Sequence, residues 1–318
     1  MFTIGCTVKG YVMNRTLMHS VGDAAVAAMN VQGNLCAIVG SIPWGFANAF
    51  MILGSMYYGE EDRRSLEDLM RYALRIGTAL SGAAMLLLML FSGILPSLFY
   101  SPSEEAWLVT QRMILLFPGF LVLNTILLLF LKAYQIQEQM PLVNALSVSE
   151  NLIMALFSAA MAGFLGADGV WLSFPASEII CLLVVAGSVI VRVKKLTFSL
   201  SDWMKLDESF GASPDECIEF RLRSMEEVVN LSIAIIDFCQ AHGIDYRRSM
   251  VAGLCVEEMA GNVIQHGFLP GEDHSVDVRV VVRDKLTIRV RDDCRAFDPQ
   301  KRLEQFDPED PSKMWAFA

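Results

Sequence analysis

The chain has 318 residues, a length that allows two or three domains. Residues 1–200 contain 11 Lys or Arg and 12 Asp or Glu, whereas residues 201–318 contain 14 and 23. A hydrophobic fraction of 54% excludes an ordinary soluble protein. The acidic balance, without a basic cluster, argues against nucleic acid as a partner. The seven cysteines include no CxxC pair and predict neither a disulfide framework nor a zinc site.

Long uncharged runs indicate that residues 1–192 are a membrane domain. A helix that crosses a bilayer needs about 20 largely apolar residues. Residues 1–20 are less apolar and contain Lys9 and Arg15, so we interpret them as the end of a sixth span that begins outside the chain. The sequence therefore predicts a multi-pass α-helical domain with about five to six spans, of which five are complete: residues 24–59, 76–103, 113–131, 142–167 and 169–191.

The positive charges predict the orientation of these spans. Lys and Arg on short loops are retained on the cytoplasmic side of a membrane. Eight of them lie in the connections after the first, third and fifth complete spans, against Arg112 alone on the opposite side. We expect a protein of the plasma membrane whose C-terminal part is cytoplasmic and whose 166–169 turn is external.

Four segments resemble the transporters of the MATE family (multidrug and toxic compound extrusion). They are residues 22–28 (GDAAVAA), 47–50 (ANAF), 58–62 (YGEED) and 166–175 (GADGVWLSFP). The likeness covers residues 1–192 and implies one six-helix lobe of a transporter that has two. Because alternating access moves one repeat against another, the resemblance also implies a second lobe or a second copy of the chain, besides the lipid bilayer, as partners.

Two carboxylates interrupt the last two spans at about mid-depth. Glu150 is the ninth residue of its run and Glu178 the tenth. An ionisable group at this depth usually faces a cavity or a partner, so both are candidates for binding a coupling ion or a proton. The alternatives are that Glu150 is displaced towards the cytoplasmic interface, and that Glu178 is a protonated acid hydrogen-bonded to a neighbouring helix.

After the last span, the residue pattern changes twice. Residues 193–216 have the composition of a linker with a short interfacial segment, and residues 217–318 form an α+β domain. Alternating and helical patterns predict a strand over 217–223, helices over 224–242 and 246–267, and hairpin strands over 275–283 and 285–292. Ser224 and Glu227 have the spacing of a capping box at the start of the first helix.

Two groups of residues in this domain are suited to nucleotide chemistry. Glu258 and Asn262 are four residues apart, so they project from one helix face, where a carboxylate and an amide can hold Mg²⁺ with its waters. Asp292 ends the hairpin, where a buried carboxylate can accept a hydrogen bond from an adenine amine. The alternative is that all three are solvated residues of a helix and a turn, without a role in ligand binding.

Together these groups resemble the site of the GHKL (Bergerat-fold) ATPases, and most closely the serine kinases that include anti-sigma factors. Residues 258–262 (EMAGN) match the Glu-x-x-x-Asn box, while Asp292 and Phe297 match part of an Asp-x-Gly-x-Gly-Phe box. Over residues 217–310, the resemblance implies ATP and Mg²⁺ as ligands, a catalytic and metal-binding Glu258, a metal-binding Asn262, and nucleotide contacts from Asn262, Asp292 and Phe297.

Departures from the second box predict weak nucleotide binding. Cys294 and Ala296 replace glycines that allow the backbone to approach the nucleotide. No Gly-x-Gly follows residue 299, so we expect a domain that is incomplete at its C-terminal end. A histidine-kinase function is disfavoured, because His242 ends its helix beside Gly243 rather than in a phosphoacceptor helix pair.

Three functions fit these patterns. The favoured one is a transporter-like lobe for multidrug or cation antiport, coupled to a cytoplasmic ATP-binding regulatory domain. The second is a membrane-anchored signalling enzyme in which Glu258 acts as general base towards a serine of a cytoplasmic protein partner. The third is a non-catalytic scaffold with a degenerate nucleotide site. The sequence identifies neither the transported substrate nor the coupling ion, and it leaves enzymatic activity open.

Overall fold

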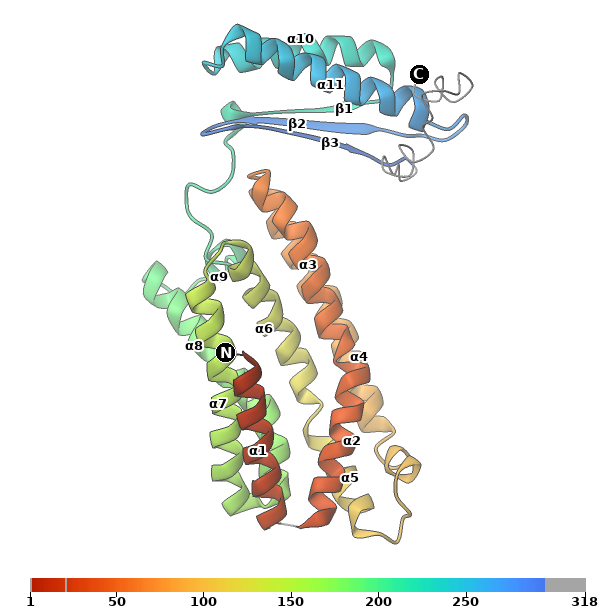
Figure 1. Cartoon of the computed structure of the whole chain (residues 1–318), viewed down its shortest axis with the longest axis vertical. Helices are drawn as coiled ribbons and strands as arrows, with labels where there is room; N and C mark the ends of the chain where they lie inside the picture. Colours follow the sequence, from red (N-terminus) through yellow and green to blue (C-terminus); the bar gives the residue numbers. More distant parts are fainter. Residues whose placement is uncertain (1, 21, 295–318) are drawn as a thin grey trace, which may run out of the picture. The chain divides into compact units, whose positions relative to one another are not determined.

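The computed structural model describes residues 2–20 and 22–294 of the chain. The chain divides into two compact units, which we call the membrane unit (Met1–Gly211) and the C-terminal unit (Ala212–Ala318) (Figure 1). Among the described residues, five helical segments are long and apolar enough to cross a membrane: Asp23–Gly59, Arg63–Leu90, Gly119–Ile136, Met140–Leu165 and Ala167–Val193.

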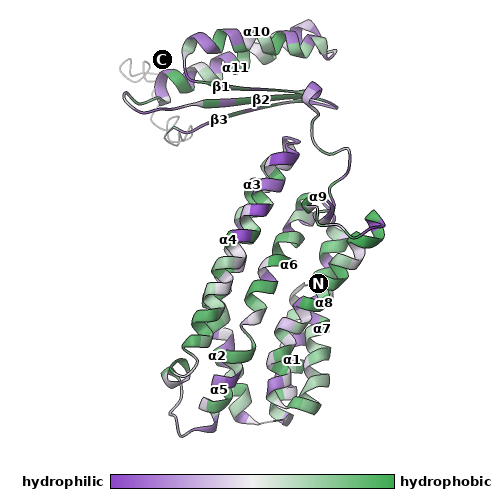
Figure 2. Ribbon diagram, turned by 180° about the vertical axis from the view of Figure 1, so that it is seen from behind, coloured by the Kyte–Doolittle hydropathy of each residue, from purple (hydrophilic) through white to green (hydrophobic). Residues whose placement is uncertain are grey.

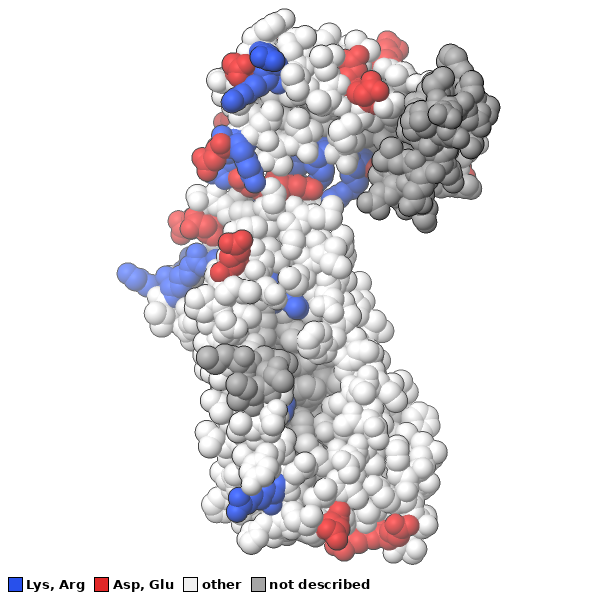
Figure 3. All heavy atoms as spheres, viewed as in Figure 1, with Lys and Arg blue, Asp and Glu red and all other residues white. Residues whose placement is uncertain are grey.

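Long helices make up the membrane unit. In Figure 2 their middle parts are mainly apolar, and hydrophilic residues collect towards their ends, as expected where a bilayer meets water. Few charged side chains lie between the two ends on the face drawn in Figure 3. The helices are α1 (Phe2–Ser20), α2 (Asp23–Val39), α3 (Ser41–Gly59), α4 (Arg63–Leu90), η1 (Leu95–Leu98), α5 (Glu105–Leu116), α6 (Gly119–Ile136), α7 (Met140–Leu165), α8 (Ala167–Val193) and α9 (Leu200–Trp203).

The first and third expected spans are each two consecutive helices. Gly40 separates α2 from α3, and a Cβ atom added there would lie 2.4 Å from the carbonyl oxygen of Cys36. The run over 113–131 crosses the junction of α5 and α6 at Phe117 and Pro118. Proline cannot donate the backbone hydrogen bond that a continuous helix requires, which accounts for the second interruption.

The second span was expected at residues 76–103, but the helix in this region begins and ends at lower residue numbers. Helix α4 begins at Arg63, because Asp62 caps it by accepting a hydrogen bond from the Ser65 backbone N–H at 3.0 Å. It ends at Leu90, and turns around Gly93 and Pro96 follow. The error arose because hydropathy detects apolar surface, whereas helix ends are set by caps and by proline.

The expected sixth span is a helix of the membrane unit. Helix α1 buries Met13 and Leu17 completely, and these side chains join a core cluster that includes Phe117 and Trp171. A second cluster surrounds Tyr134 towards the other helix ends. Each core draws on several helices far apart in the sequence, so α1 is an integral part of this unit.

The segment after α8 is packed against the membrane unit, although the sequence suggested a linker. Met204 and Leu206 are buried in the second core cluster. The ring of Phe210 stacks on Tyr58, with the two centroids 4.7 Å apart. The Arg63 guanidinium donates to the carbonyl oxygens of Asp207, Glu208 and Phe210. Apolar side chains within this otherwise polar stretch therefore hold residues 197–210 against the helices of the membrane unit.

The C-terminal unit is a layer of two helices on one face of a sheet (Figure 1). The sheet is antiparallel with the order β1-β2-β3. The capping box of Ser224 and Glu227 is present at the start of α10, as expected. Alternate valines of β2 face the helices and form the core with them. The elements are η2 (Pro214–Glu216), β1 (Cys217–Leu222), α10 (Met225–Ala241), α11 (Tyr246–Gly267), β2 (Val276–Val282) and β3 (Leu286–Asp292).

Candidate functional site

Glu178 lies in the interior of the membrane unit. Its side chain, on α8, is fully buried. Asn124 of α6 donates a hydrogen bond from Nδ2 to Glu178 Oε1 at 3.0 Å. The second carboxyl oxygen, Oε2, is buried and has no hydrogen-bond partner among the described residues. A buried polar atom without a partner is costly, so this oxygen can receive a proton or a cation.

Local features of α8 hold Glu178 in place. Pro175, one turn earlier, has no N–H and opens the backbone ladder beside it. The Ser177 hydroxyl donates to the Phe174 carbonyl at 2.9 Å. The Phe174 ring meets those of Phe117 and Phe120 edge-on, at centroid distances of 6.3 and 6.0 Å. The interrupted part of α8 is thus fixed against the break between α5 and α6.

Glu150 lies on α7, which packs against α8, the helix that carries Glu178. Its side chain is half-buried. Asn151, next to Glu150, is buried and donates from Nδ2 to the Ser147 carbonyl at 2.8 Å.

Sequence reasoning identified the two carboxylates but not Asn124 or Asn151. Both are polar residues within apolar helices, so the signal was available. The bond between Asn124 and Glu178 becomes visible only when α6 and α8 are packed together. Carboxylate and amide oxygens can bind hard cations, and polar groups inside a membrane domain usually lie on ion or proton paths.

In the C-terminal unit, Glu258 and Asn262 are both exposed on α11. Asn262 donates from Nδ2 to Glu258 Oε1 at 3.0 Å, so the two side chains share one helix face. The end of this helix lies near the end of the hairpin, because a Cβ atom added to Gly267 would be 3.0 Å from Cys294 Sγ. The C-terminal end of α11 and the end of β3 therefore lie close together.

Asp292 differs from the expected buried adenine acceptor. Its side chain is exposed, and Oδ1 accepts a hydrogen bond from the backbone N–H of Cys294 at 3.0 Å. A short Asp side chain after a strand commonly bonds to the backbone two residues later, which explains the difference. Phe297, the remaining expected contact, lies outside the described residues.

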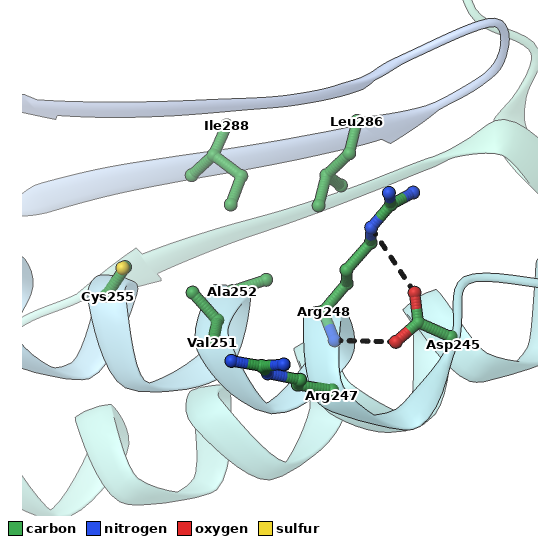
Figure 4. A pocket seen from close by; sticks show the side chains of 8 residues that line it. All are labelled: Asp245, Arg247, Arg248, Val251, Ala252, Cys255, Leu286 and Ile288. Carbon is green, nitrogen blue, oxygen red and sulfur yellow. Dashed lines mark hydrogen bonds and ion pairs between the residues drawn. The ribbon is translucent and has the colours of Figure 1, made fainter.

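A groove of about 630 Å³ lies between α11 and β3 (Figure 4). Leu286 and Ile288 of β3 face α11 across it. Arg248 is held at one end by Asp245, whose Oδ2 lies 3.3 Å from its Nε. Glu258, Asn262 and Asp292 are not among the lining residues, which are Asp245, Arg247, Arg248, Val251, Ala252, Cys255, Leu286 and Ile288.

Comparisons with known proteins bear on the membrane unit. Residues 4–157 match the family model MatE. The chain resembles a structure described as MATE in complex with MaL6, at 20% identity and a TM-score of 0.54, over 61% of this chain and 44% of that one. It also resembles an inward-facing multidrug resistance MATE family transporter of the MOP superfamily, at 20% identity and a TM-score of 0.56, over 65% and 46%. No curated protein matches the chain.

These similarities relate the fold of the membrane unit to part of a MATE transporter. Together with the MatE match over residues 4–157, they indicate a multi-pass membrane protein. It spans less than half the length of the solved transporters that it resembles. The MatE match ends at residue 157, so the likeness of residues 217–310 to GHKL ATPases stays a hypothesis.

Proposed function

We propose that the membrane unit is one half of a cation-coupled efflux transporter, with Glu178 as the coupling site. The observation that carries the proposal is the fully buried carboxylate whose Oε2 has no partner among the described residues. The MatE match and the resemblance to multidrug transporters support it. A second lobe or a second copy of the chain completes the transporter, because alternating access requires two repeats.

A binding measurement tests Glu178 without requiring flux. The purified full chain in detergent is heated in sodium or in choline salts over a range of pH. A cation or proton that binds only the folded state raises the unfolding temperature, and Glu178→Gln should remove this dependence. Glu105→Gln, an exposed carboxylate at the start of α5, is the matched control. Equal dependence in wild type and Glu178→Gln would contradict the proposal.

We also propose that the C-terminal unit is cytoplasmic and binds ATP with Mg²⁺, and thereby regulates the lobe. Glu258 and Asn262 support the metal part, since both are exposed and already in register on α11. Asp292 is exposed, and its Oδ1 already accepts from the Cys294 N–H, so we expect weak binding. Glu258 would orient the metal and its water, and the bound nucleotide would supply the phosphates.

Titration of the full chain with a fluorescent ATP analogue tests the second proposal. Asn262→Ala should remove the magnesium dependence, and Asp292→Asn should weaken binding. Gln265→Ala, an exposed neighbour on α11, serves as the control. Binding that is insensitive to both changes would place the nucleotide elsewhere. Phosphate transfer to a protein serine would indicate the signalling enzyme instead, and no binding at all would indicate the scaffold.

A further inference from the structure

We propose a transition-metal site, suited to Zn²⁺, formed by His274, Asp293 and Cys294 at one end of the sheet. One ligand atom from each of these side chains lies within 4.8 Å of the other two. Imidazole nitrogen, thiolate sulfur and carboxylate oxygen are the donors that Zn²⁺ takes in proteins. None of the residues proposed to bind the coupling cation or the nucleotide is a ligand, so the inference is independent of both functions.

The antiparallel hairpin brings the ligands together. Val276, the first residue of β2, pairs with Asp292, the last residue of β3. His274 precedes this pair by two residues and Cys294 follows it by two, so both lie at the same end of the sheet.

The C-terminal end of α11 closes this position. Gly267 approaches Cys294 so closely that a Cβ atom there would be 3.2 Å from the cysteine Cβ. The ring of Phe268 lies 5.5 Å from that of His274, measured between centroids. The His274 side chain is only 10% exposed as a result. The carbonyl end of a helix attracts cations, so α11 favours a metal here.

Asp293 is already fixed as a ligand. Its Oδ1 accepts a hydrogen bond from the Ser275 backbone N–H at 3.0 Å and lies 3.2 Å from His274 Nδ1. These contacts hold one carboxyl oxygen of Asp293 beside the imidazole ring, where it can bind a cation.

The second nitrogen of His274 has the neighbour that a metal-bound histidine needs. Nε2 is buried and has no hydrogen bond within the part of the chain that the structure describes, yet Glu272 Oε2 lies 3.3 Å from it. A carboxylate beside the second ring nitrogen usually orients a histidine that binds metal through the first. When Nδ1 binds the metal, the imidazole carries its single proton on Nε2 instead of on Nδ1, where it now faces Asp293 Oδ1, and a small rotation of Glu272 lets it accept that Nε2 proton.

Metal binding at Cys294 requires its thiolate. A metal ion favours the thiolate, so the Sγ–H bond breaks, an Sγ–metal bond forms and the proton passes to solvent. Tetrahedral ligand atoms stand about 3.5 Å apart, so small side-chain rotations close the cluster from 4.8 Å. The exposed side of Asp293 leaves the fourth position open to water.

Cobalt titration of the full chain in detergent tests the site, because Co²⁺ replaces Zn²⁺ and reports its ligands by absorption. We expect one Co²⁺ per chain, with tetrahedral bands and a thiolate-to-cobalt charge-transfer band, all displaced by Zn²⁺. Cys294→Ser should abolish the charge-transfer band, and His274→Gln should lower the affinity about tenfold or more. Cys255→Ser, an exposed cysteine of α11, is the matched control and should leave both unchanged.

Two results would overturn the inference: a charge-transfer band that survives Cys294→Ser, or one that Cys255→Ser removes. Far-ultraviolet circular dichroism verifies that each variant folds. If His274→Gln fails to fold, Cys294→Ser carries the test, since it replaces only the sulfur. Asn262→Ala should leave cobalt binding intact, which separates this inference from the proposal of nucleotide binding.

Discussion

The Asn124 amide donates to one oxygen of the Glu178 carboxyl at 3.0 Å, and leaves the other oxygen buried and without a partner among the described residues. A side chain of α6 thus orients the candidate coupling site on α8. Because this hydrogen bond joins α6 to α8, a change in the charge of Glu178 would affect both helices. Asn124 is therefore a positioning residue for that carboxylate.

Removing this positioning amide should weaken cation binding without abolishing it. Asn124→Ala leaves both oxygens of Glu178 without a donor, which costs about 1–3 kcal/mol. In the thermal measurement above, the cation concentration that gives half of the stabilisation should rise. Glu178→Gln should remove the effect altogether, and the double variant should behave like Glu178→Gln. Additive changes in the double variant would show that the two residues act separately.

Helices α7 and α8 are in close contact at Gly169. A Cβ atom there would lie 2.5 Å from the Met161 carbonyl oxygen and 2.6 Å from its carbonyl carbon. Gly169→Ala should therefore push α8 away from α7 and destabilise the unit by about 1–3 kcal/mol. Gly163→Ala, whose new Cβ would meet nothing within 4 Å, is the control and should be neutral or stabilising. The unfolding temperatures of the two purified variants measure these effects. Equal unfolding temperatures for Gly169→Ala and Gly163→Ala would contradict the packing argument.

The Arg63 guanidinium holds residues 197–210 against the membrane unit. It donates to the Ser201 hydroxyl and to the carbonyl oxygen of Phe210 at 3.3 and 3.1 Å. Arg63→Ala should allow this segment to open, so trypsin should cut after Lys205 several times faster. Arg64→Ala, at the exposed neighbouring position, is the control. An unchanged rate in Arg63→Ala would show that apolar packing alone fixes the segment.

The orientation can be tested with two exposed serines. Ser103 lies between α4 and α5, and Ser213 precedes β1. Ala167, in the turn expected to be external, is buried, which makes Ser103 the better position. An impermeant thiol reagent should label Ser103→Cys but not Ser213→Cys in intact cells that express a cysteine-free background. The reverse pattern would invert the orientation that the Lys and Arg count predicts.

The Asp293 carboxylate should make the stability of the C-terminal unit depend on pH. Its pKa is lowered in the folded chain, chiefly by the Ser275 N–H. Its contribution is therefore complete above the unfolded carboxyl pKa of about 3.9, and disappears as the pH falls through the lower folded value. Asp293→Asn should reduce the unfolding temperature at neutral pH and converge with wild type in acid. Asp284→Asn, in the exposed hairpin turn, should show no such difference.

Sequence reasoning succeeded where the determinants of structure are local. The capping box at Ser224 and the turn between β2 and β3 depend on neighbouring residues, so their positions could be predicted. The start of α4 at Arg63 was missed, because the Asp62 cap lies outside the apolar run. Hydropathy also gave no sign that Phe210 would stack on Tyr58.

The sites were predictable to different degrees. A carboxylate within an apolar helix is visible in the sequence, and Glu178 was selected as a candidate in this way. Asn124 required the packing of α6 against α8. The cluster of His274, Asp293 and Cys294 has no metal-binding spacing in the sequence, since the register of two strands brings its members together. The exposure of Asp292 was also hidden, because it depends on how the chain turns after β3.

The α2–α3 segment is too long for the membrane that it crosses. Its 37 residues extend about 55 Å as helix, against a hydrocarbon thickness of about 30 Å. A tilt accommodates only part of this excess, so one end must stand in water. The end of α3 carries Tyr58, on which Phe210 stacks just before the C-terminal unit begins. Because Phe210 stacks on Tyr58, a tilt of α3 would displace Phe210 as well, and would carry a motion of the membrane helix to the last residues before the C-terminal unit.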